Sequence, residues 1–169
     1  ALTMAKNAQR LDINCQNAYW SEALVHYLRR DLAQFRRTIE QVLPLNPANP
    51  FMVVAVSLLL GLSGQISRAV EMTNRAIRLS PYSPRWYHII PFINHYMDEE
   101  YELALNEALQ INTPTCFWDP LLRAAVYGQL GRRSEARAAY AELLQIQPAF
   151  VQRRDKLMQG MFLSDPMLK

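Results

Sequence analysis

The stretch GQLGRRSEARAAYAELLQIQP, residues 128–148, contains an alanine (Ala136), a leucine seven residues later (Leu143) and a proline five residues after that (Pro148). The same spacing recurs at residues 1–13, 35–47, 69–81 and 101–113. The last members of the five sets fall at positions 13, 47, 81, 113 and 148, in steps of 34, 34, 32 and 35 residues. A nearly fixed period of this length predicts an array of structural repeats.

Each period divides into two helices, because apolar residues recur at spacings of three and four and no long stretch alternates as a strand does. Asn49 and Ser83, each followed by a proline, are typical of helix starts, and Gly64 and Gly131 of helix ends. The expected first helices cover 15–28, 50–63, 84–97 and 117–130, and the expected second helices cover 31–45, 66–79, 98–111 and 134–146. The sequence therefore predicts an all-α fold.

This periodicity predicts a single repeat domain over residues 1–160. We expect a half-repeat at 1–13, repeats at 14–47, 48–81, 82–113 and 114–148, a capping helix at 149–160 and a tail at 161–169. Because residues 1–13 carry only the second-helix pattern, we expect the chain to be a fragment of something larger. The apolar face around Leu2, Met4 and Ala5 would then be uncovered, which predicts self-association as a homodimer.

The composition is that of a soluble domain: half of the 169 residues are apolar, a fifth are charged and the net charge is +3. The arginine doublets are scattered, which favours a solvated surface over contact with nucleic acid. Apolar runs stay below 18 residues, so no contact with a membrane is expected. Cys15 and Cys116 lie three repeats apart, too far for a disulfide, which favours a cytoplasmic location.

The repeat pattern resembles that of the tetratricopeptide repeat (TPR) family, which has an early aromatic residue, small residues at helix crossings and a proline after the second helix. The matching positions are Tyr19 with Ala23, Tyr127 with Gly131, Ala69 with Ala76, and Ala136 with Pro148. This sequence departs from the pattern where Phe35 and Tyr101 fill a small-residue site and Thr113 replaces the proline. The resemblance implies an α-α superhelix of about four helix pairs over nearly the whole chain.

A narrower resemblance concerns bacterial signalling proteins. The segments LNPANP (45–50), SPRWYHIIPFINHY (83–96), CFWDPLLRAAVYGQLGRRSEARA (116–138) and FLSDPMLK (162–169) are similar to repeat regions that follow a class III adenylate/guanylate cyclase or a winged-helix domain. This resemblance implies a regulatory binding module of such a protein, with the effector domain upstream. The alternative is a stand-alone adaptor that binds a partner helix or peptide.

The sequence offers little for catalysis or for a cofactor. His88 and His95 are seven residues apart on an expected helix, about 10 Å along its axis, so one metal ion could not bind both without a bend. No His–Cys or His–Ser spacing indicates a nucleophile, and no glycine-rich phosphate loop is present. We therefore expect no enzyme, no cofactor and no metal site in this chain.

The first helices of such an array line its concave surface, which is used for binding. The TPR resemblance implies four stripes: Asn17, Trp20, Leu24 and Tyr27; Phe51, Val54, Leu58 and Gly61; Arg85, His88, Phe92 and His95; Trp118, Leu121, Ala125 and Gln129. These stripes predict a groove for a protein or peptide partner, or for a small ligand, with a polar spot at Arg85, His88 and His95. The same phase places Trp86 off the groove. Alternatively, a tightly curved array closes the stripes onto one another as core.

Overall fold

The computed structural model describes residues 1–80 and 82–161, and every regular element in this part of the chain is a helix. Residues 162–169, most of the expected tail, lie outside the described residues, as does Pro81. The elements are α1 (Leu2–Leu11), α2 (Gln16–Leu28), α3 (Leu32–Ile39), α4 (Val42–Leu45), α5 (Pro50–Leu62), α6 (Ile66–Leu79), the 3₁₀ helix η1 (Arg85–His88), α7 (Ile89–Met97), α8 (Tyr101–Ile111), α9 (Trp118–Gln129), α10 (Arg133–Ile146) and α11 (Phe150–Met161). The all-α prediction is confirmed.

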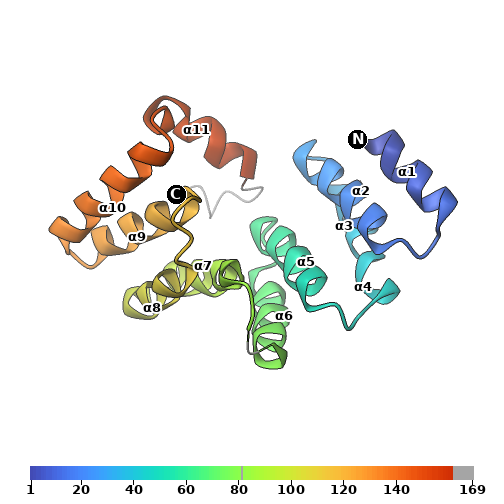
Figure 1. Cartoon of the computed structure of the whole chain (residues 1–169), viewed down its shortest axis with the longest axis horizontal. Coiled ribbons are helices and arrows are strands. Elements are labelled where there is room, and N and C mark those ends of the chain that lie inside the picture. The colour runs from blue at the N-terminus through green and yellow to red at the C-terminus, as the bar shows by residue number, and fades with distance from the viewer. Residues whose placement is uncertain (81, 162–169) are drawn as a thin grey trace.

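Helices that follow one another along the chain pack side by side, as in a repeat array. The pairs are α2 with α3 and α4, α5 with α6, η1 and α7 with α8, and α9 with α10. Together they form an arch, with α1 near one end and α11 near the other (Figure 1). The first helix of each pair lies toward the hollow of this arch.

The same type of turn joins the first helix to the second in all four pairs. Arg30, Gly64, Glu99 and Gly131, which we call the turn residues, have left-handed φ values of 59°, 98°, 60° and 69°. In each case the N–H of the following residue donates to the carbonyl five residues before it, over 2.9–3.0 Å; the pairs are Asp31–His26, Gln65–Leu60, Glu100–His95 and Arg132–Tyr127. This is the Schellman pattern of helix ends. Equivalent residues of different pairs can therefore be identified by counting from the turn residue.

Small or buried side chains stand at the crossing of the two helices, five residues after the turn residue. Phe35, Ala69 and Ala104 are fully buried there. A Cβ added to Gly61 of α5 would lie 3.2 Å from the Cβ of Ala69, so α5 and α6 approach each other closely at this point. In the third pair, Ala104 takes the crossing position that the sequence pattern assigned to Tyr101, which is only half-buried.

Two prolines change the expected helices. Pro44 has no N–H for the carbonyl of Glu40, and its ring would clash with that carbonyl, so the helix expected at 31–45 is divided into α3 and α4. Pro91 is tolerated in the first turn of an α-helix, and the helix expected from residue 84 accordingly begins as η1 and becomes α-helical only at Ile89.

The helix ends follow the expected chemistry only in part. Asn49 accepts a hydrogen bond from the backbone N–H of Met52 at 3.2 Å, which confirms it as the cap of α5. Ser83 does not cap its helix, because the residue before η1 is Pro84, which makes no side-chain cap bond. The helix expected at 98–111 begins at Tyr101, because Asp98 to Glu100 form the turn.

A continuous core runs through the array, from Ala23 in α2 to Val126 in α9. Ala5 of α1 is also buried, so this residue is not on the uncovered face where the sequence placed it; Met4, at 76% exposure, is. Cys15 and Cys116 are both free, as expected.

Candidate functional site

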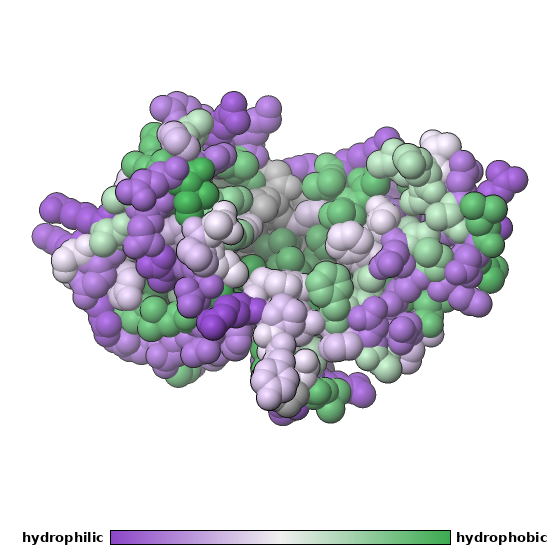
Figure 2. All heavy atoms as spheres, viewed as in Figure 1, coloured by the Kyte–Doolittle hydropathy of each residue, from purple (hydrophilic) through white to green (hydrophobic). Residues whose placement is uncertain are grey.

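The inner face of the first helices is the candidate site. Trp20 and Leu24 of α2 are four residues apart, and both are half-buried. Leu58 of α5 and Leu121 of α9, at the matching positions counted from their turn residues, are half-buried as well. Figure 2 shows apolar atoms gathered where the molecule is hollowed between its two ends. These side chains pack on the core with one side and leave apolar surface on the other.

Some residues of the predicted stripes belong to the core instead. Tyr27, Val54 and Phe92 are 3%, 1% and 3% exposed, so they offer almost no surface to a ligand. Burial raises the pKa of the Tyr27 phenol well above its usual value, although the charge of Arg30 opposes this shift. The phenol is therefore neutral at physiological pH. Trp118, by contrast, is only partly buried.

The expected polar spot on the third helix does not form. Nδ1 of His88 lies 2.7 Å from Oε2 of Glu107 in α8, and Nδ1 of His95 lies 2.6 Å from Oε2 of Glu100. Both histidines thus contact residues of the second helix or of the turn before it. Arg85 is exposed in η1, and no hydrogen bond or ion pair joins it to either histidine among the described residues.

The expected inner face of the third pair differs from the observed one because the spacing between turn residues changes by one residue. The turn residues Arg30 and Gly64 are 34 positions apart, whereas Glu99 follows Gly64 by 35. When the inner positions of the second pair are moved forward by 34 residues, they fall one residue too early in the third pair. One residue corresponds to a rotation of about 100° around the helix axis. Counted from Glu99, the inner face of this pair carries Trp86 and Tyr96, which are half-buried, and Ile89 and Ile93, which belong to the core.

Ring contacts agree with this corrected face. The rings of Trp86 and Phe51, which hold the same position in successive pairs, meet edge to face with centroids 5.6 Å apart. Trp86 also meets the ring of Tyr87, with centroids 4.8 Å apart. Its contact with Phe51 nonetheless favours a place on the inner face, where the sequence did not put it. Tyr96 stacks on Phe92 at 5.6 Å, and its hydroxyl accepts a hydrogen bond from Nε2 of Gln129 at 3.2 Å. Gln129 thus links α9 to the inner side of α7.

No residue of this segment signals the change of period. A glycine at position 99 would have marked the turn, as Gly64 and Gly131 do, but Glu99 adopts the left-handed conformation without being a residue that favours it.

One polar group on the inner face lacks a partner. Nε1 of Trp20 is buried, and no hydrogen-bond acceptor for it is found in the part of the chain that the structure describes. An unpaired buried donor costs about 1–3 kcal/mol. A carbonyl or hydroxyl oxygen brought by a ligand would offset this cost.

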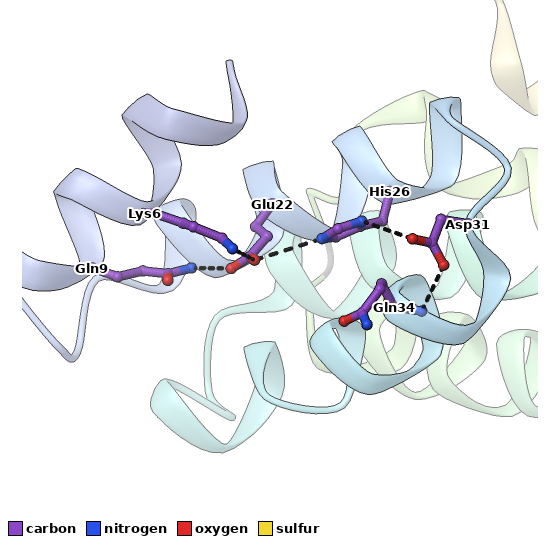
Figure 3. Close-up of polar contacts among 6 residues, drawn as sticks. All are labelled: Lys6, Gln9, Glu22, His26, Asp31 and Gln34. Atoms are coloured by element: carbon purple, nitrogen blue, oxygen red, sulfur yellow. Dashed lines mark hydrogen bonds and ion pairs between the residues drawn. The ribbon is translucent and has the colours of Figure 1, made fainter.

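A second polar cluster lies at the N-terminal end of the array (Figure 3). His26 is 8% exposed and lies between two carboxylates, with Nε2 at 3.6 Å from Glu22 and Nδ1 at 3.8 Å from Asp31. Glu22 also accepts a hydrogen bond from Gln9 at 2.7 Å and lies 3.9 Å from Lys6. No role for His26 was expected from the sequence. Because its neighbours come from α1, α2 and the start of α3, we interpret this cluster as the polar joint that holds α1.

Two searches of residues 1–80 and 82–161 bear on other functions. No group of three or more His, Cys, Asp or Glu side chains there could hold a metal ion. No helix in this part is both long enough and apolar enough to cross a membrane.

Comparison with known proteins supports the fold. No family model matches the sequence, and no curated protein matches it at a significant level. Among solved structures, a crystal structure of the MamA protein superimposes with a TM-score of 0.60 at 13% identity, over 90% of this chain and 84% of that one. A second MamA crystal structure gives 0.60 at 19% identity over 86% and 88%, and one titled MamA MSR-1 C2 gives 0.58 at 15% over 90% and 92%.

The chain therefore has the fold of a TPR-like helical-repeat protein. The TPR protein MamA is among the proteins whose solved structures share this fold. Sequence identities of 13–19% extend this likeness to the fold alone.

Proposed function

We propose that this chain is a non-catalytic binding module whose inner face takes an apolar or amphipathic segment of a partner protein. The observation that carries the proposal is the series of half-buried apolar side chains along successive first helices, above all Trp20, Leu24 and Leu58. An amphipathic helix laid into such a groove contacts it through side chains at helical spacing.

The shape of the inner face favours a protein segment over a small molecule. Small ligands prefer enclosed cavities that bury most of their surface. Two cavities of about 540 and 330 Å³ open on the molecule, but neither is lined by the residues predicted for the groove. The inner face instead has partly exposed apolar side chains on successive first helices, among them Trp20, Leu58 and Leu121, and apolar surface of this kind is typical of protein interaction sites.

The wider organisation is also a proposal. We take residues 1–160 as one repeat domain, cytoplasmic in location, in which the exposed Met4, Leu11 and Ile13 allow contact with a second copy. We place it as the C-terminal regulatory part of a bacterial signalling protein with a cyclase or winged-helix domain, on the strength of the sequence resemblance. Reading the gene upstream of Ala1 tests this context. A gene without either domain would favour the stand-alone adaptor.

The groove proposal is tested with peptides selected by display against the purified chain. Leu58→Glu places a charge on the inner face, and Leu103→Glu places the same charge on the exposed side of α8, where Leu103 is 46% exposed. We expect selected peptides to bind Leu103→Glu as they bind the parent chain, and to bind Leu58→Glu at least about tenfold more weakly, because a buried unpaired carboxylate is costly. Equal affinity for both variants would contradict the proposal, provided that both retain a helical circular dichroism spectrum.

A further inference from the structure

A cavity of about 540 Å³ opens where the loop after α4 meets α5 and α6. Its walls are mostly apolar and include Pro47, Pro50, Val53, Met72 and Leu79. This volume lies within the range of about 300–1,000 Å³ that is usual for small-ligand pockets. None of the inner-face residues lines it, so it is separate from the proposed groove.

The described walls of this cavity contain one charged side chain, Arg75 of α6. Arg75 is exposed, and within residues 1–80 and 82–161 its guanidinium makes neither a hydrogen bond nor an ion pair. Arg68, earlier in the same helix, forms an ion pair with Glu40, the C-cap residue of α3. Among the described residues, the cavity thus combines apolar walls with a guanidinium that forms no ion pair.

A related cavity between the third and fourth pairs shows what is missing. It measures about 330 Å³, and its walls include Asp119, Arg123 and Glu142. Glu142 stands eleven residues after the turn residue Gly131, which is the position that Arg75 holds after Gly64. Nε of Arg123 lies 2.7 Å from Asp119 and Nη2 lies 2.6 Å from Glu142. In this cavity two carboxylates neutralise the guanidinium, whereas no carboxylate of the described residues lines the cavity at Arg75.

The walls also indicate what kind of anion fits. Pro47 and Pro50 have no N–H, and the backbone groups of α5 and α6 are engaged within their helices, so the cavity offers few partners to the amides of a peptide. An aliphatic chain needs no such partners. The geometry points to a binding site for a medium-chain aliphatic monocarboxylate, with the chain against Val53 and Met72 and the carboxylate on the guanidinium of Arg75.

Calorimetric titration of the intact chain with decanoate, below its micelle concentration, tests this assignment. We expect Arg75→Gln to weaken decanoate binding about tenfold or more, because it removes a charge-assisted hydrogen bond. Arg78→Gln, which removes a neighbouring cation that does not line the cavity, should leave the affinity unchanged. Octanoate should bind about fifteenfold more weakly than decanoate, since each buried methylene contributes about fourfold. The neutral analogue 1-decanol should not distinguish the two variants.

Methyl NMR spectra locate the bound chain. The methyl signals of Met72 and Leu79 should shift on titration with decanoate, and those of Leu24 and Leu58 on the inner face should not. Leu79→Glu, at a position 72% exposed, provides a second variant that repels the carboxylate while leaving the core untouched. Absence of decanoate binding, equal binding by Arg75→Gln and Arg78→Gln, or shifts at Leu58 instead of Met72 would each overturn the assignment. Neither the absence of decanoate binding nor equal binding by the two arginine variants bears on the peptide groove.

Discussion

The second helix pair (α5 and α6) and the third (η1, α7 and α8) share the same turn and the same crossing, yet they meet different local constraints. In the second pair, glycines allow both the close approach at Gly61 and the left-handed turn at Gly64. In the third pair, Tyr96 stands at the position of Gly61, and Glu99 adopts the left-handed turn at φ 60°. The comparison teaches that the turn residue, and not a fixed period, determines which face of a first helix lines the hollow.

The largest expected effect concerns the crossing. If Ala69 and Ala104 are equivalent, then Ala69→Phe and Ala104→Phe should each lower the free energy of unfolding by about 1–3 kcal/mol, because overpacking a closed crossing forces the helices apart. Leu103→Phe, at the neighbouring exposed position, should change it by less than about 0.5 kcal/mol. Urea denaturation measures all three. A small effect of Ala104→Phe together with a large effect of Tyr101→Ala would restore the register that the sequence pattern suggested.

A smaller and opposite pair of effects is expected at the turns. Glu99→Gly should stabilise the chain by up to about 1 kcal/mol, because glycine adopts positive φ without the steric cost that a Cβ brings. Gly64→Ala should destabilise it by about 1 kcal/mol, because it introduces that cost at φ 98°. Thermal unfolding of the two variants checks the signs. A destabilising effect of Glu99→Gly would contradict the left-handed conformation assigned to residue 99.

The smallest effect concerns the ion pair between Glu40, the C-cap residue of α3, and Arg68 of α6, which joins the first and second pairs. The hydrogen bond from Arg68 lowers the pKa of the Glu40 carboxyl, with the opposing effect of partial burial being weaker. A lowered pKa stabilises the folded chain above the unfolded value of 4.5, and this contribution is lost as the pH falls through the folded pKa.

Arg68→Gln should therefore cost only a few tenths of a kcal/mol at pH 7, since both side chains are about half exposed. The difference from the parent chain should shrink as the pH falls below 4.5. Urea denaturation at pH 7 and in this acid range measures it. A difference that grows in acid would contradict the assigned direction of the pKa.

The fold was predictable because it rests on local signals that repeat. The spacing of Ala69 and Ala76, and of Ala136 and Leu143, reflects helix crossings that must stay close in every pair. The second helix of the first pair is divided into α3 and α4, and this division also had a sequence signal. A proline within a helix breaks it at the preceding turn, and Pro44 lies within the expected helix.

The face of the third helix was not predictable in the same way. Its phase depends on a one-residue change in period, and Glu99 carries no mark of the left-handed turn it forms. The cavity at Arg75 was still less predictable from the sequence. Its existence depends on how α4, the following loop and α6 meet, and the lack of a counter-ion becomes visible only when Arg75 is compared with Glu142 in three dimensions.

We propose that the corrected inner face binds a partner segment. An NMR titration with a display-selected peptide, followed through the three tryptophan indole N–H signals, tests this proposal. Trp20, Trp86 and Trp118 report from α2, η1 and α9 respectively. We expect all three signals to shift together, with a common midpoint, while the backbone signals around Leu103 on α8 do not shift. Shifts confined to α8 and α10, with all three indole signals unchanged, would contradict it.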